Sequence, residues 1–69
     1  MTPDEFKAWR KAMGLTQVTA AKALDLSTST IEMYDSGKRK NDGSPVSIPR
    51  TVALACAALY HKLEPWGDR

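Results

Sequence analysis

The stretch LTQVTAAKALDLSTSTIEMYDSGKRK, residues 15–40, contains two short helical patterns separated by a short break. The first pattern predicts a helix over about residues 17–24 and the second a helix over about residues 28–36. Each is preceded by a hydroxyl residue that can cap a helix. Asp25, in the break, tolerates the left-handed backbone conformation better than most residues. The stretch therefore predicts two helices joined by a tight turn.

The second of these helices has two different faces. When its residues are placed at 100° each, Ile31 and Tyr34 point to one side. Short or flexible side chains occupy the opposite arc, and they are Thr28, Ser29, Glu32, Met33 and Ser36. An outer face of this kind is suited to close approach to another surface.

The N-terminal segment predicts a further helix. Thr2 can cap it, Pro3 suits its first position, and Glu5 can reach back to the cap. Phe6 and Trp9 then recur at helical spacing, and a glycine at position 14 can close the helix.

Residues 38–48, KRKNDGSPVSI, predict an exposed basic loop rather than a β-hairpin. Pro49 then opens a last helix, residues 49–63, and Trp66 in the following tail could pack back. One apolar stripe of this helix is expected to close the core, and it comprises Val52, Ala55, Cys56, Leu59 and Leu63. A second stripe is expected to form a dimer interface, and it comprises Leu54, Ala57, Ala58 and His61.

The composition narrows the class of protein. A chain of 69 residues with these patterns predicts one all-α, four-helix domain over residues 1–69. Its net charge is only +2, yet the positive residues cluster after position 37. One cysteine and one histidine give no disulfide and no metal-ligand set. We expect no cofactor. We also expect a cytoplasmic protein, because residues 1–69 show no leader and no apolar run long enough to span a bilayer.

The outer face of the helix at residues 28–36 has the chemistry needed to read DNA bases. The major groove admits one α-helix, and the hydroxyls of Thr28 and Ser29 can bond to base edges. Glu32 can accept from a cytosine amino group, and Met33 can lie against a thymine methyl. Residues on either side of this helix suit the phosphate backbone, and these are Gln17, Ser27, Lys38, Arg39, Lys40 and Asn41.

Simpler interpretations compete with this one. The polar face could be ordinary solvated surface, and the cationic run could serve only solubility. Ser29 and Glu32 also have capping-box spacing, so Glu32 could serve a helix that begins two residues later. Catalysis is not expected, because no phosphate loop, paired carboxylate site or metal-ligand spacing is present.

The run from residue 14 to residue 39 resembles the helix-turn-helix of the lambda-repressor-like, or XRE/Cro-type, DNA-binding domains. The matching features are Leu15-Thr16-Gln17, Ala21, the turn before Leu26-Ser27, Ile31, Tyr34, Asp35 and Gly37. The resemblance implies that Thr28, Ser29, Glu32 and Met33 face base edges. It implies that Gln17, Lys38 and Arg39 hold the DNA backbone. It also implies a structural ion pair between Arg10 and Asp35.

The sequence departs from that family in two places. Asp25 stands where the family usually has glycine, and one loop and one long helix follow Gly37 in place of two helices. The layout has a weaker resemblance to small phage or mobile-element autoregulators, including those that accompany anti-CRISPR genes.

These observations favour a dimeric transcriptional repressor that binds an inverted repeat in double-stranded DNA, with no small-molecule ligand. An alternative is a protein-binding adaptor, such as an antitoxin or a polymerase-binding protein, that uses the stripe containing Leu54 and Ala58. A non-specific DNA-coating protein is a third hypothesis, which the modest net charge disfavours.

Overall fold

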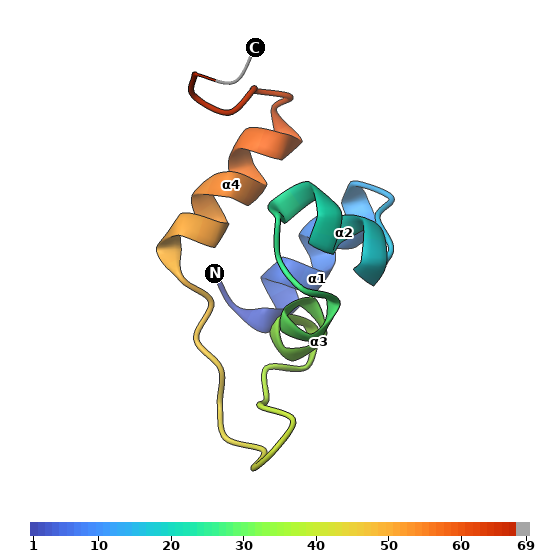
Figure 1. The fold of residues 1–69 in the computed structure, drawn as a ribbon, viewed down its shortest axis with the longest axis vertical. Helices are drawn as coiled ribbons and strands as arrows, with labels where there is room; N and C mark the ends of the chain where they lie inside the picture. Colours follow the sequence, from blue (N-terminus) through green and yellow to red (C-terminus); the bar gives the residue numbers. More distant parts are fainter. Residues whose placement is uncertain (68–69) are drawn as a thin grey trace.

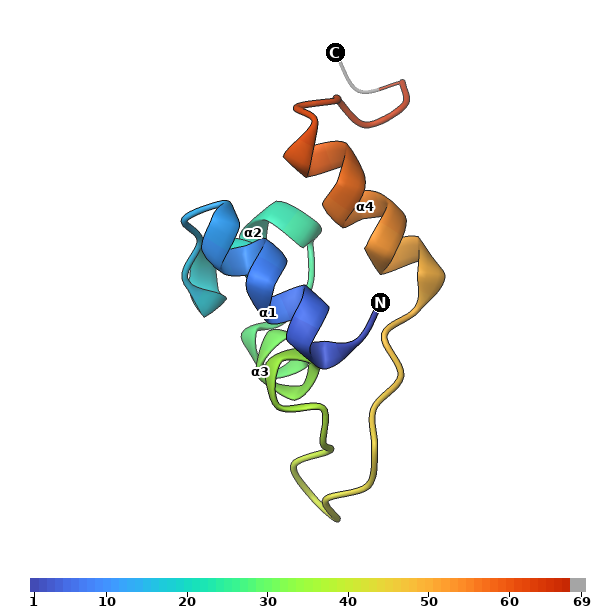
Figure 2. The ribbon, with the colours of Figure 1, turned by 180° about the vertical axis from the view of Figure 1, so that it is seen from behind.

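The computed structural model describes residues 1–67, which contain four α-helices joined by turns and one long loop (Figure 1). They are α1 (Pro3–Ala12), α2 (Gln17–Leu24), α3 (Thr28–Ser36) and α4 (Arg50–Tyr60). These residues contain no strand, and the all-α prediction is confirmed. The first three helices pack together, and α4 covers α1 and α2 after a long excursion of the chain (Figures 1 and 2).

Side-chain caps set the starts of the first three helices. The Thr2 hydroxyl accepts from the Glu5 amide at 3.1 Å, and the Glu5 carboxylate accepts from the Thr2 amide at 2.7 Å. The bond that the Glu5 carboxylate accepts from the Thr2 amide lowers the pKa of Glu5. Thr16 and Thr19 cap α2 by the same reciprocal arrangement. Ser27 caps α3 by accepting from the Thr30 amide, so the alternative of a capping box between Ser29 and Glu32 is wrong.

Two left-handed residues set the path around α3. Asp25 ends α2 with φ of 57°, and the short side chain of an aspartate tolerates that conformation. Gly37 ends α3 with φ of 75°, and a Cβ there would lie 2.9 Å from Cγ of Pro3. Glycine is therefore required at position 37 both for its backbone conformation and for the close approach of α1.

The core lies where the four helices meet. Phe6, Ile31 and Cys56 are its largest fully buried side chains, from α1, α3 and α4 respectively. The rings of Phe6 and Tyr34 form a T-shaped pair with a centroid distance of 5.4 Å. The indole N–H of Trp9 donates to the Cys56 carbonyl at 2.9 Å, which joins α1 to α4.

The C-terminal end of α4 differs from the prediction. The helix ends at Tyr60, because Lys62 adopts a left-handed conformation with φ of 58°. The amides of Lys62 and Leu63 then bond back to the carbonyls of Leu59 and Ala58, which is the Schellman arrangement. Leu63, expected in the core, is 62% exposed.

Two expectations for the residues before and after α4 are also corrected. Pro49 precedes α4 as its cap residue and is not part of the helix. Trp66, which could have packed back onto the domain, is fully exposed at 102%.

The basic loop, residues 38–48, is stabilised at its base. Lys38 and Pro45 form an antiparallel bridge, and the Arg39 amide donates to the Ser44 carbonyl at 2.8 Å. Ile48 is buried in the core and anchors the returning limb. The tip therefore projects from a fixed base at the end of α3 (Figures 1 and 2).

We predict that Ile31→Ala lowers the free energy of unfolding by about 2–5 kcal/mol, because it opens a cavity at a fully buried position. Urea denaturation followed by circular dichroism measures this. Val18→Ala is the control, because Val18 is 51% exposed and its loss should change stability by less than about 0.5 kcal/mol. Equal effects of the two substitutions would contradict this account of the core.

Candidate nucleic-acid interface

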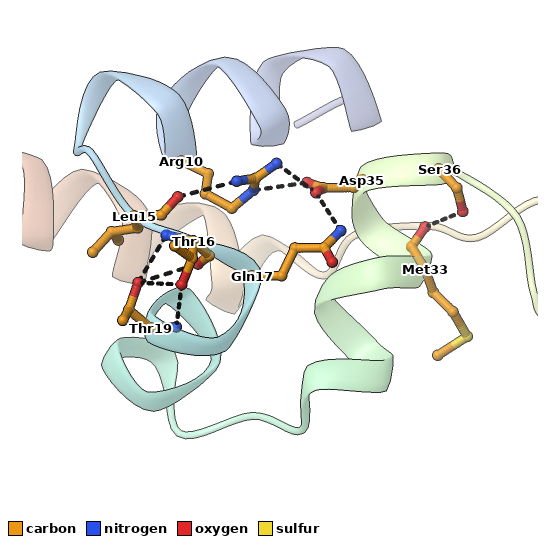
Figure 3. Close-up of polar contacts among 8 residues, drawn as sticks. All are labelled: Arg10, Leu15, Thr16, Gln17, Thr19, Met33, Asp35 and Ser36. Atoms are coloured by element: carbon orange, nitrogen blue, oxygen red, sulfur yellow. Dashed lines mark hydrogen bonds and ion pairs between the residues drawn. The ribbon is translucent and has the colours of Figure 1, made fainter.

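The orientation of α3 is determined by its buried side. Ile31, Tyr34 and Asp35 are buried against the other helices. On the other side Ser29 and Ser36 are exposed, and Thr28, Glu32 and Met33 are half-buried. The Met33 side chain extends away from the contacts that Asp35 makes (Figure 3). All four predicted base-contacting residues therefore remain accessible on one side of α3.

Asp35 holds three helices together through its carboxylate (Figure 3). Its Oδ2 lies 2.8 Å from Nη2 of Arg10 in α1, and it accepts from Nε2 of Gln17 in α2 at 3.0 Å. Arg10 also donates to the Leu15 carbonyl at 3.0 Å, at the entrance to α2. The ion pair that the family resemblance implied is present. Asp35 is only 7% exposed, so these partners replace the water that the charge would otherwise require.

The contact between Gln17 and Asp35 was missed by sequence reasoning. Gln17 was expected to donate its amide to a phosphate, but the structure places the amide nitrogen against the buried carboxylate. Gln17 lies in the first turn of a helix, and nothing in the local sequence indicates that its side chain would bond to Asp35, 18 residues further along the chain. The donors that this helix start can offer to a phosphate are therefore the first backbone amides of α2.

The other expected phosphate-binding residues lie near the ends of α3. Ser27 uses its hydroxyl to cap the helix. Lys38, Arg39, Lys40 and Asn41 follow the helix and are all exposed. The exposed Lys40 differs from the others, because its ammonium forms an ion pair with Glu32 on the outer face of α3. The structure thus brings the basic loop and the predicted reading face together.

The predicted dimer stripe lies on the outside of α4. Leu54 is 59% exposed, and Ala57 and His61 are also exposed. Ala58 is half-buried, because it lines an apolar groove of about 290 Å³ between the end of α2 and α4. The groove is lined by Ala23, Leu24, Asp25, Ala55, Ala58, Leu59, Leu63 and Pro65.

Three other kinds of site were considered in the described residues: a reactive thiol, a metal site and a membrane-spanning helix. Burial raises the pKa of the Cys56 thiol to about 11, so the reactive thiolate is scarce at neutral pH. Within residues 1–67, no three His, Cys, Asp or Glu side chains gather as a metal site. In the same part of the chain, each helix is too short or too polar to cross a bilayer.

A curated protein of Methanocaldococcus jannaschii, named an uncharacterized HTH-type transcriptional regulator, is similar to this chain. The two are 39% identical over 54 residues. The alignment covers 78% of this chain and 22% of that protein, so the chain spans about a fifth of the relative's length. No family model and no solved structure matches the chain. The similarity supports a helix-turn-helix unit, with which the arrangement of α2, the turn and α3 is compatible.

We predict that Asp35→Ala lowers the free energy of unfolding by about 3 kcal/mol, because it leaves the guanidinium of Arg10 mostly buried without its counter-ion. Adding Arg10→Met to that variant should recover part of the loss. Thermal or urea unfolding measures both. Glu64→Ala is the control at an exposed carboxylate, and a loss at Asp35 no larger than at Glu64 would contradict the structural role of the network.

Proposed function

We propose that this chain is a sequence-specific DNA-binding transcriptional regulator of the XRE/Cro type. One observation carries the proposal. The helix α3 is fixed through its buried side, while its small polar outer face stays accessible beside an exposed cationic loop. A helix entering the major groove needs such a face, and phosphate binding needs cations at its border. The relative named as a transcriptional regulator supports the same class.

Base reading is assigned to the outer face of α3. The hydroxyls of Thr28 and Ser29 would donate to or accept from base edges. Glu32 would accept from the amino group of cytosine, and the thioether chain of Met33 would lie against a thymine methyl. These contacts determine sequence preference, whereas the phosphate contacts contribute most of the affinity.

Phosphate binding is assigned to the two borders of α3. Lys38, Arg39 and Asn41 are exposed in the basic loop. At the other border, the first backbone amides of α2 point out of the helix start and favour an anion. Because the amide nitrogen of Gln17 is engaged with Asp35, Gln17 would act there mainly by orienting α2.

The regulator would bind as a homodimer through the outer side of α4. The exposed Leu54, with Ala57 and His61 near it on the helix, offers a surface that a two-fold related copy could cover. Two α3 helices would then enter successive major grooves about 34 Å apart, on an inverted repeat with half-sites about 10 base pairs apart. Occupation of such a site in the cytoplasm would block transcription, and a phage or mobile-element autoregulator acts in this way on its own promoter.

We predict that Lys38→Ala combined with Arg39→Ala weakens binding to every duplex. The slope of log affinity against log salt should fall by about 0.9 for each phosphate that the variant no longer neutralises. Gel-shift titration at several salt concentrations, on the DNA upstream of the chain's own gene, measures this. Ser29→Ala or Met33→Ala should instead change base preference at single positions, by about 1–3 kcal/mol each. If neither set of variants altered binding, the assignment of faces would fail.

We predict that Leu54→Glu converts a dimer into a monomer, because it places a charge in the middle of the proposed interface. Sedimentation equilibrium measures the molecular mass, with Ala8→Glu on the exposed side of α1 as the control. A wild-type chain that is monomeric at every concentration and also on DNA would contradict the dimer.

The second candidate function is a protein-binding adaptor. It is favoured by the apolar groove between α2 and α4, which the exposed Leu63 helps to line. A monomer that shifts no duplex would favour the adaptor. Equal affinity for unrelated duplexes would instead favour a non-specific DNA-coating protein.

A further inference from the structure

The ion pair between Glu32 and Lys40 joins the outer face of α3 to the basic loop. Lys40 Nζ contacts Oε1 of the glutamate, and the two side chains are 55% and 39% exposed respectively. Oε2 of Glu32 has no hydrogen-bond partner within residues 1–67. Lys38 and Arg39 have no ion-pair partner in the same part of the chain, so Lys40 differs from its neighbours.

Stability of the free domain does not explain this pair. Exposed ion pairs usually contribute between 0 and about 1 kcal/mol, because both charges remain hydrated. Glu32 also takes no part in starting α3, since Ser27 caps that helix. A role at the surface that α3 presents to a partner is the better explanation.

A carboxylate on a DNA-binding face is unfavourable unless its charge is compensated. Phosphates on both sides of the major groove repel it, and the exclusion of water strengthens that repulsion. A lysine held against one carboxylate oxygen removes the net charge and leaves the other oxygen available. That oxygen can still accept from the amino group of cytosine, the base whose major-groove edge offers a donor to a carboxylate.

We propose that Lys40 is the internal counter-ion of Glu32, and that the neutral pair reads a cytosine in the major groove. Lys40 is then a positioning residue for base recognition and not a phosphate contact, in contrast to Lys38 and Arg39. The inference rests on the proposed DNA-binding function and deepens it, because it names one base in the target and the two side chains that select it.

The test uses a duplex selected by the wild-type chain from a random-sequence library, and all of its single-base variants. Affinities are compared for wild type, Glu32→Gln, Lys40→Gln and the double variant. Either single substitution should reduce the preference for cytosine at the same position by about tenfold, and the double variant should lose no more than either single one. Lys40→Arg should keep the preference, because it keeps the charge.

Lys38→Gln is the matched control and should weaken all the duplexes alike. Circular dichroism verifies that each variant keeps its helices, which is expected because Lys38 and Lys40 are exposed and Glu32 lies outside the buried core. If Lys40→Gln behaves like Lys38→Gln, Lys40 binds phosphate and the inference is wrong. Unchanged base preference in Glu32→Gln also overturns it, while the proposed function survives in both cases. A wild-type chain that selects no duplex overturns both.

Discussion

The buried carboxylate of Asp35 is the constraint on which the arrangement of the helices depends. Its charge is tolerated inside the domain only because Arg10 and Gln17 approach it from two other helices. The same contacts determine how α3 is rotated, since Asp35 must face them. A polar contact of this kind has directional requirements that apolar packing lacks. Ile31 and Tyr34 contribute the burial on that side of α3, and the carboxylate restricts the helix to one rotation about its axis.

The rotation of α3 and the position of the basic loop are physically connected. Gly37 ends the helix against Pro3, and the bridge between Lys38 and Pro45 then determines where the loop leaves the domain. Cations near the reading face therefore result from a backbone arrangement as well as from composition. This explains how a chain with a net charge of only +2 can present a basic border on one side.

The starts of the first three helices and the buried side of α3 could be predicted from the sequence, because the residues that determine them are close together in the chain. Thr2, Thr16 and Ser27 each lie next to the helix they cap, and the spacing of Ile31 and Tyr34 identifies the buried side of α3. The contacts of Gln17 and Lys40 could not be found this way, since each depends on where two segments meet in space. Leu63 was misplaced for a different reason. Its position followed the apolar stripe of the last helix, whereas Lys62 interrupts the helix before that stripe is complete.

The two tryptophans lie in opposite environments, and this has a consequence for spectroscopy. Trp9 is packed in the core with its indole N–H bonded to the Cys56 carbonyl, whereas Trp66 is fully exposed. Indole emission moves to longer wavelength when water surrounds the ring, so the fluorescence of the native domain is a sum of one shielded and one solvated emitter. Trp66 would contribute a nearly constant background during denaturation. A Trp66→Phe variant would leave Trp9 as a single optical reporter of the contact between α1 and α4.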